Sequence, residues 1–153
     1  MYNQSTNESL CQMEFFERNV EKIKKKFAHL STEDRYKLLI DMGQKSLPYP
    51  EEKKRAEHRV AGCQSTLYLT ASLQKGKISF LAASDSLISL GLAALLIEAY
   101  CEVSPETLLA APPKFLQELG ILQSLSLNRS QGLVSVYCHM QRLAKEALQK
   151  ETN

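Results

Sequence analysis

The chain has 153 residues, of which 44% are hydrophobic and 24% are charged, a composition that predicts one globular domain spanning residues 1–153. Its formal net charge of only +2 argues against a strong electrostatic field for nucleic acid. The first ten residues are polar, unlike a secretory signal, and the most apolar run, residues 87–97, is too short to cross a bilayer. We therefore expect a cytoplasmic protein with no nucleic-acid or membrane partner.

Two amphipathic helices are predicted before Pro48. Apolar residues at three- and four-residue steps predict the first helix over residues 9–30. Ser31, with Asp34 three residues later, is typical of a helix N-cap. The second helix is expected to bury a face that includes Leu47, and Pro48 ends it.

A loop and a β-hairpin are predicted next. Residues 48–62 show no apolar period, which predicts an exposed loop that could include one helical turn around residues 51–55. Apolar and polar residues then alternate over residues 67–73, as in a half-buried strand. Turn-forming residues at 74–77 lead into a second alternating segment that begins at Ile78, so we expect an antiparallel hairpin.

Helices are predicted for the rest of the chain. Asp85 can cap a helix over residues 86–101, which is apolar on nearly all sides and should be central. A Ser-Pro-Glu sequence at residues 104–106 predicts another helix start. A final amphipathic helix is expected to begin at Asn128 or Ser130. The order of helices, hairpin and helices predicts an α+β fold, with a small antiparallel β-sheet packed against several helices.

The four cysteines differ in context. Without a secretory signal they predict free thiols, and no CxxC pair or zinc-like Cys/His spacing occurs, so we expect no metal site. Cys11, Cys101 and Cys138 fall on or beside apolar helix faces, where cysteine acts as a small packing residue. Cys63 instead follows Gly62 where a loop leads into a strand, and loops carry function more often than element interiors.

The residues around Cys63 leave two interpretations open. His58, Arg59 and the lysines before them make this segment electropositive, which favours the reactive thiolate. In one interpretation Cys63 is a nucleophile at a loop tip, with His58 as a candidate base. In the other it is a buried packing residue at the start of a strand. The chain offers no obvious Asp or Asn to orient His58 and no glycine-rich oxyanion loop, and His29 and His139 are expected to be bystanders.

Four blocks of sequence carry a resemblance to a known family. They are LPYPEEKKRAEHRVAGCQS, LYLTASLQKGKISF, ASDSLISLGLAALLIEAY and LNRSQGL, in this order within residues 33–148. Together they resemble the SufE family of sulfur-acceptor proteins, whose relatives include CsdE. The resemblance implies an α+β fold similar to that of IscU-type scaffold proteins, with a third strand in or near the loop before Cys63.

The resemblance also implies a function. Cys63, in the sequence Gly62-Cys63-Gln64-Ser65, would accept sulfur as a persulfide from a PLP-dependent cysteine desulfurase of the SufS or CsdA type. The chain would stimulate this desulfurase and pass the sulfur to a SufBCD-type scaffold for iron–sulfur cluster assembly. It would need no cofactor of its own and would be a sulfur-transfer accessory protein, not a stand-alone enzyme. A monomer or weak dimer is expected.

Several residues are candidates to support Cys63. Arg129 lies in a sequence that matches a family turn expected near the cysteine loop, where it could position the loop or simply bond nearby carbonyls at a helix start. The other candidates are Gly62, Gln64, Ser65, His58 and Arg59. The alternative function is an IscU-type iron–sulfur scaffold, but a scaffold needs several cluster ligands close together, and the other cysteines fall in predicted helices.

Overall fold

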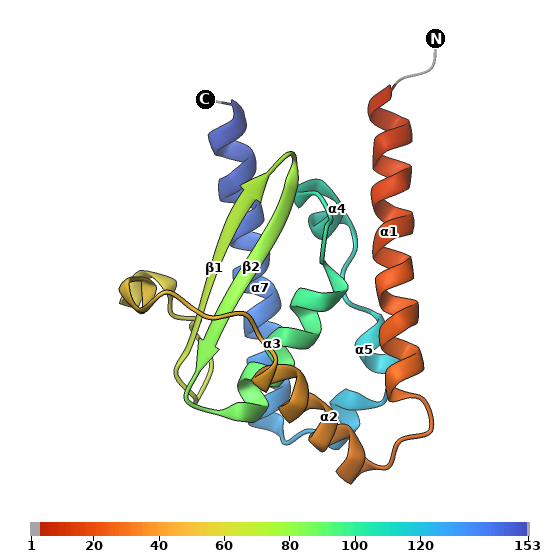
Figure 1. Ribbon diagram of the computed structural model, residues 1–153, viewed down its shortest axis with the longest axis vertical. Coiled ribbons are helices and arrows are strands. Elements are labelled where there is room, and N and C mark those ends of the chain that lie inside the picture. The colour runs from red at the N-terminus through yellow and green to blue at the C-terminus, as the bar shows by residue number, and fades with distance from the viewer. Residues whose placement is uncertain (1–3, 153) are drawn as a thin grey trace.

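The structure, a computed structural model, describes the backbone of residues 4–152 and the side chains of residues 11–150. Within this range, the fold consists of seven helices and a two-stranded sheet that packs on α3 and α7, which confirms the predicted α+β fold (Figure 1). The helices are α1 (Gln4–Phe27), α2 (Thr32–Gln44), α3 (Leu87–Ala99), α4 (Pro105–Ala110), α5 (Phe115–Glu118), α6 (Ile121–Ser124) and α7 (Leu127–Thr152). The strands are β1 (Leu67–Gln74) and β2 (Lys77–Ser84).

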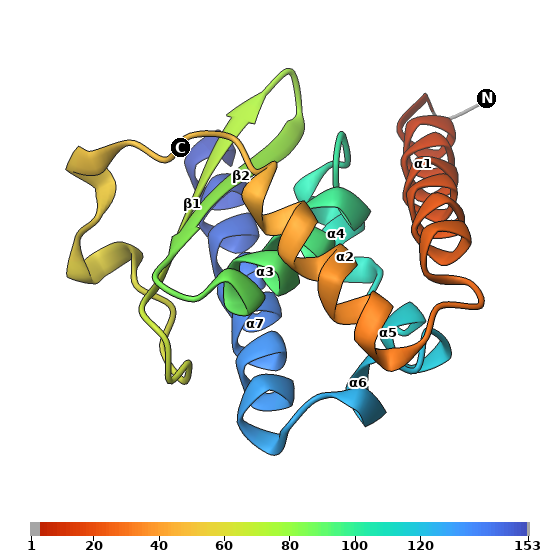
Figure 2. The ribbon, with the colours of Figure 1, turned by 60° about the horizontal axis from the view of Figure 1, so that its bottom comes forward.

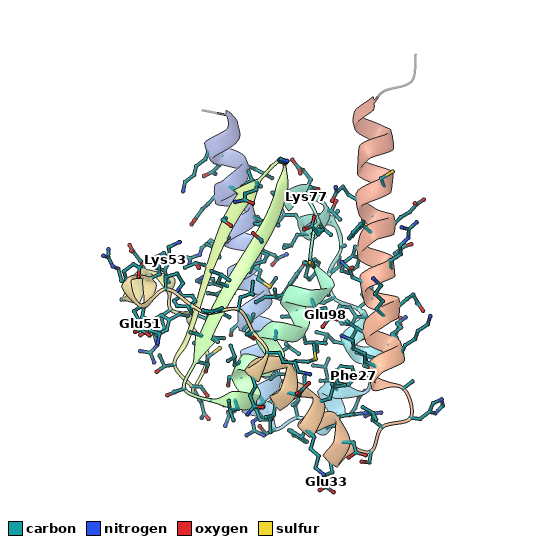
Figure 3. The ribbon with its side chains drawn as sticks, viewed as in Figure 1. Phe27, Glu33, Glu51, Lys53, Lys77 and Glu98 are labelled. Carbon is teal, nitrogen blue, oxygen red and sulfur yellow. The ribbon has the colours of Figure 1, made fainter. Side chains whose placement is uncertain are left out.

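The hairpin forms where the alternating pattern predicts it. β1 and β2 pair antiparallel from Leu67 opposite Ser84 to Gln74 opposite Lys77. Lys75 and Gly76 form the turn with φ values of 52° and 77°, the left-handed pair that matches the twist of a two-residue hairpin. The loop before β1 extends to one side of the hairpin, away from the helices (Figure 2), and contains two 3-10 turns, Glu51–Lys53 and Ala56–His58. Glu51 and Lys53 are exposed on the first of these turns (Figure 3).

Helix α3 is central, as its apolar sequence predicts. It contacts α1, α2, α7 and β2, and seven of its side chains or glycines are buried. The crossing with α2 is a backbone contact, because a Cβ atom added to Gly43 would lie 2.9 Å from the amide nitrogen of Gly91. Small residues at this crossing therefore allow α2 to lie directly on α3, and the start of α3 in turn supports the end of the cysteine-containing loop.

Several predicted helix boundaries are corrected. Ser31 caps α2 as expected, since its hydroxyl accepts the Asp34 N–H at 3.1 Å. The first helix, however, ends at Phe27, because His29 adopts a φ of 62° that no α-helix contains. The second helix ends at Gln44, so Leu47 lies beyond it and is 71% exposed instead of buried.

Two predicted N-caps are wrong by one to four positions. Helix α3 is capped by Ser86, whose hydroxyl accepts the Ser89 N–H at 3.3 Å, and not by Asp85. Helix α7 begins at Leu127, and the Ser126 hydroxyl accepts the Arg129 N–H at 3.3 Å. The expected third strand is also not formed within residues 4–152, where the segment before Cys63 contributes only a single bridge to β1.

The cysteine thiols are all free, as predicted, but the expected packing role of the three helix cysteines is wrong. Cys11, Cys101 and Cys138 are exposed, and Cys63 alone is half-buried. On α7 the buried residues nearest to Cys138 are Val136, His139 and Met140, so Cys138 itself faces solvent. No helix in the described part of the chain is long and apolar enough to span a membrane.

Candidate functional site

The loop that carries Cys63 is closed at both ends. At its start, Arg59 bridges to Tyr68, and the buried Val60 donates its N–H to the Leu67 carbonyl at 2.8 Å. At its end, the Thr66 N–H donates to the Asp85 carboxylate at 3.1 Å, and the Asp85 N–H donates to the Thr66 carbonyl at 3.3 Å. The short segment between these contacts presents Cys63 at its tip.

Gly62 brings the loop tip onto helix α7. Its φ of 88° lies in the left-handed region that side chains rarely adopt. A Cβ atom at this position would also lie 2.5 Å from the hydroxyl of Ser135 on α7. Glycine therefore meets both a conformational and a steric requirement immediately before the cysteine.

Cys63 packs against α7 in an arrangement that disfavours its reactive thiolate form. Its thiol donates to the Gly132 carbonyl with an Sγ–O distance of 3.7 Å, and its side chain contacts the hydrophobic core. Burial raises the pKa of the Cys63 thiol, because the thiolate loses its hydration. The lowered pKa expected from an electropositive loop is therefore not found in this arrangement.

Cys63 opens into a mainly polar cavity of about 420 Å³. Gln64 and Ser65 line it from the loop, and Ser65 accepts a hydrogen bond from Ser89 of α3 at 3.0 Å. Arg129 lines it from α7, with its guanidinium carbon 5.8 Å from the ring centroid of Tyr36. Further lining comes from both helix starts, at Ser86, Ser126 and Asn128, and from Leu67, Leu92, Gly132, Leu133 and Val136.

His58 and Arg59 do not join this cavity among the described residues. His58 lies beside Glu57, with Nε2 3.6 Å from the carboxylate oxygen, and Arg59 is exposed on the bridge to β1. The structure thus brings Gly62, Gln64, Ser65 and Arg129 together around Cys63 but leaves out the candidate base.

Three contributions to the site were missed by sequence reasoning. Asp85 holds the end of the cysteine loop, and Gly132 and Ser135 form the surface on which the loop tip rests. His139, the expected bystander, is not among the described residues that line the cavity; it is buried, and its Nε2 lies 3.3 Å from the Leu69 carbonyl on the outer edge of β1. Burial lowers the pKa of His139, which favours its neutral form as a structural residue. Gly132 and Asp85 carried a signal, because they lie in the quoted blocks LNRSQGL and ASDSLISLGLAALLIEAY, whereas Ser135 lies in none.

Fold and site define a class: an α+β domain that presents one half-buried cysteine at the tip of a closed loop. The family described as SufE, Fe–S metabolism associated domain, matches residues 21–144. The chain therefore belongs to the SufE family.

Curated relatives agree with this assignment. A SufE-like protein of Synechocystis is 35% identical over 127 residues, which cover 82% of this chain and 80% of that protein. The sulfur acceptor protein CsdE of Escherichia coli is 34% identical over 116 residues, covering 74% of this chain and 79% of that protein. SufE-like protein 1 of Arabidopsis thaliana, chloroplastic or mitochondrial, is 32% identical over 72% of this chain, which spans only 30% of that longer protein.

A solved structure shares the fold. The solution structure of a hypothetical protein from Thermus thermophilus matches with a TM-score of 0.72 and 25% sequence identity. The match covers 86% of this chain and 96% of that one. The arrangement of helices around the small sheet is therefore found in an experimental structure of similar length.

Proposed function

We propose that this chain is a sulfur acceptor, and that Cys63 receives sulfur from a cysteine desulfurase of the SufS or CsdA type. Support comes from membership of a family associated with Fe–S metabolism and from the likeness to the sulfur acceptor CsdE. The observation that carries the proposal is the position of Cys63, which among the described residues is the one cysteine that lines the cavity at the loop tip. The acceptor then delivers sulfur to a SufBCD-type scaffold, in the cytoplasm.

The proposed reaction is a sulfur transfer with no net oxidation. The Cys63 thiolate attacks the outer sulfur of a persulfide on the desulfurase cysteine. A new S–S bond forms at Cys63, the S–S bond on the donor breaks, and the donor cysteine leaves as a thiolate. The proton that Cys63 loses passes to solvent or to a donor base. The chain acts as a covalent carrier and stimulates the desulfurase by removing its persulfide.

The packed loop supports a gated version of this reaction. The raised pKa of Cys63 keeps the thiol protonated while it lies against α7, which protects it from oxidants and electrophiles. Attack on the donor needs the thiolate and an exposed sulfur, so the loop tip has to leave α7 when the desulfurase binds. The contacts that hold each end, Val60 to Leu67 and Thr66 to Asp85, leave the tip between them free to move as a unit.

The cavity lining favours a carrier over an iron–sulfur scaffold. A cluster needs several thiolate or similar ligands within reach of one another. Cys63 is surrounded instead by serines, Gln64, Asn128, Arg129 and aliphatic side chains. No group of three or more His, Cys, Asp or Glu side chains with metal-binding geometry is found among the described residues.

Desulfurase turnover tests the proposal. We expect the wild-type chain to increase the rate of alanine release from cysteine, and Cys63→Ser to abolish this increase while still binding the desulfurase. Cys138→Ser is the matched control, because Cys138 is an exposed helix residue outside the cavity, and should stimulate like the wild type. Full stimulation by Cys63→Ser would show that the chain acts only as an adaptor, and would reject the carrier.

A further inference from the structure

One edge of the sheet lacks a strand partner over most of its length (Figure 1). On this edge, Ile78 of β2 forms an isolated antiparallel bridge with Val103, and its N–H donates to the Val103 carbonyl at 2.9 Å. Backbone groups of successive residues point to alternate sides of a strand, so those of Phe80 and Ala82 point the same way as those of Ile78. Within residues 4–152, no bridge continues beyond Ile78 on this edge.

An apolar groove of about 620 Å³ lies along the unpaired part of the edge. The consecutive residues Phe80, Leu81 and Ala82 all line it. Because neighbouring side chains of a strand point to opposite faces, this run indicates that the backbone edge itself forms one wall. Helix α2 forms the other wall through Leu38 and Met42, while Ala94 and Ile97 of α3 line the groove between them.

We propose that this groove binds an extended segment of a partner polypeptide, which adds to β2 as a further strand. The backbone of the segment would pair with the N–H and C=O groups of Phe80 and Ala82, and its alternate side chains would enter the apolar groove. The bridge from Val103 shows that the edge already pairs with an extended backbone at one end.

The surroundings of the groove specify the chemistry of this segment. Two charge pairs lie at its rim, Lys26 with Glu98 at 2.6 Å and Lys45 with Asp41 at 2.9 Å. Glu98 projects from α3 toward α1 (Figure 3). Because each charge has an opposite partner, the rim carries little net field, and the groove suits an uncharged, apolar segment.

The position of α2 opposite β2 favours a single strand over a second copy of the chain. A strand added to β2 lies about 4.8 Å from it, and α2 stands on the far side of that position. A second copy pairing through its own β2 would bring β1 and its helices into the same space. Among the described residues, the groove shares no lining residue with the Cys63 cavity, so a partner can bind here while Cys63 meets a sulfur donor.

Amide hydrogen exchange of the whole chain, followed residue by residue by NMR, tests the inference. In the free protein, the amides of Phe80 and Ala82 should exchange faster than that of Leu81, which faces the β1 ladder. The probe is a short peptide selected for binding to the whole chain from a random displayed library. Its binding should slow exchange at Phe80 and Ala82 by at least about tenfold, with little change around Cys63.

Two variants serve as a matched pair for the same peptide. Ile97→Glu places a charge in the groove and should weaken binding by at least about tenfold. Val134→Glu changes an exposed valine of α7 outside the groove and should leave binding unchanged.

Three results would overturn the inference. The first is that the selected peptides slow amide exchange at residues outside the groove, or that the selection yields no binding peptide. The second is slow exchange at Phe80 and Ala82 that depends on protein concentration without peptide, since this would show that a second copy covers the edge. The third is equal binding by both variants.

Discussion

At the scale of single residues, Cys63 combines burial with a contact that is easily broken. The thiol donates one long, weak hydrogen bond to the Gly132 carbonyl, and burial raises its pKa above that of the unfolded chain. The protonated thiol therefore stabilises the packed loop at every pH below the unfolded value. That contribution is lost as the pH rises through the higher pKa of the folded state.

The pH profile of alkylation at Cys63 tests this description. With a small alkylating reagent, and with the site followed by mass spectrometry, the rate should rise at a higher pH in the folded chain than in the urea-unfolded chain. The reason is that only the thiolate reacts and burial disfavours it. A rise at a lower pH in the folded chain would show that a positive charge controls Cys63, and would contradict the packed state.

Gly62 should control how firmly the loop tip is held. We expect Gly62→Ala to reduce the free energy of unfolding by about 1–2 kcal/mol, because alanine is strained in the left-handed region. Alkylation of Cys63 should also become faster as the tip lifts from α7. Combining Gly62→Ala with Ser135→Ala removes the hydroxyl that the new Cβ would meet, so any loss that remains measures the backbone strain. Urea titration gives the energies, and an unchanged stability of Gly62→Ala would show that the loop does not adopt this conformation.

Residue roles were only partly predictable from sequence. Cys63 and Gly62 stand out because a glycine and a thiol meet at a loop-to-strand junction within a family motif. Asp85 and Ser86 could not be told apart, since both are good N-cap residues and only the tertiary position of Thr66 gives the carboxylate another partner. The prediction that positive charge around Cys63 favours its thiolate is wrong, because the loop turns His58 toward Glu57 and away from the cavity.

At the scale of elements, close packing of α2 on α3 fixes the frame around the site. The two helices touch through Gly43 and Gly91, where their backbones are too close for a side chain. From the start of α3, Ser86 and Ser89 reach the cavity, and Asp85 just before it holds the end of the cysteine loop. A shift of α3 would therefore also move the cysteine loop and the cavity around Cys63.

Two helical glycines should respond oppositely to alanine. Gly91→Ala places a methyl group onto the Leu39 carbonyl and should destabilise the fold by about 3 kcal/mol or more. Gly132→Ala, in α7, meets only the Cys63 sulfur at an ordinary contact distance of 3.7 Å. It should therefore stabilise the fold by about 0.5–1 kcal/mol, through helix propensity. Urea unfolding measures both effects, and similar losses in the two variants would contradict the described helix contacts.

Elements with a clear period were predicted well. The hairpin and the central helix follow directly from alternation and from uniform apolarity. Helix ends were predicted poorly and the expected third strand was predicted wrongly, because both depend on tertiary contacts. Leu47 continues an apolar pattern yet lies beyond α2, and the segment at Arg59 is paired at one residue only.

At the scale of the whole molecule, one set of buried side chains connects all the main elements. It runs from Phe16 of α1 to Ala144 of α7 and includes Phe80 of β2 and Leu96 of α3. Tyr100 lies within it, stacked on Phe16 with ring centroids 4.9 Å apart, and donates to the Ala111 carbonyl at 2.6 Å. We propose on this basis that residues 1–153 form a single domain, a stable body from which one loop tip can move.

The central claim is that Cys63 carries sulfur, and peptide mass spectrometry tests it most directly. The chain is mixed with a cysteine desulfurase and free cysteine, trapped with an alkylating reagent and digested. A variant that keeps Cys63 but has serine at positions 11, 101 and 138 removes competing thiols. We predict one additional, reductant-sensitive sulfur atom on the peptide that contains Cys63. Absence of that sulfur from the Cys63 peptide, while the desulfurase is active and bound, would contradict the account.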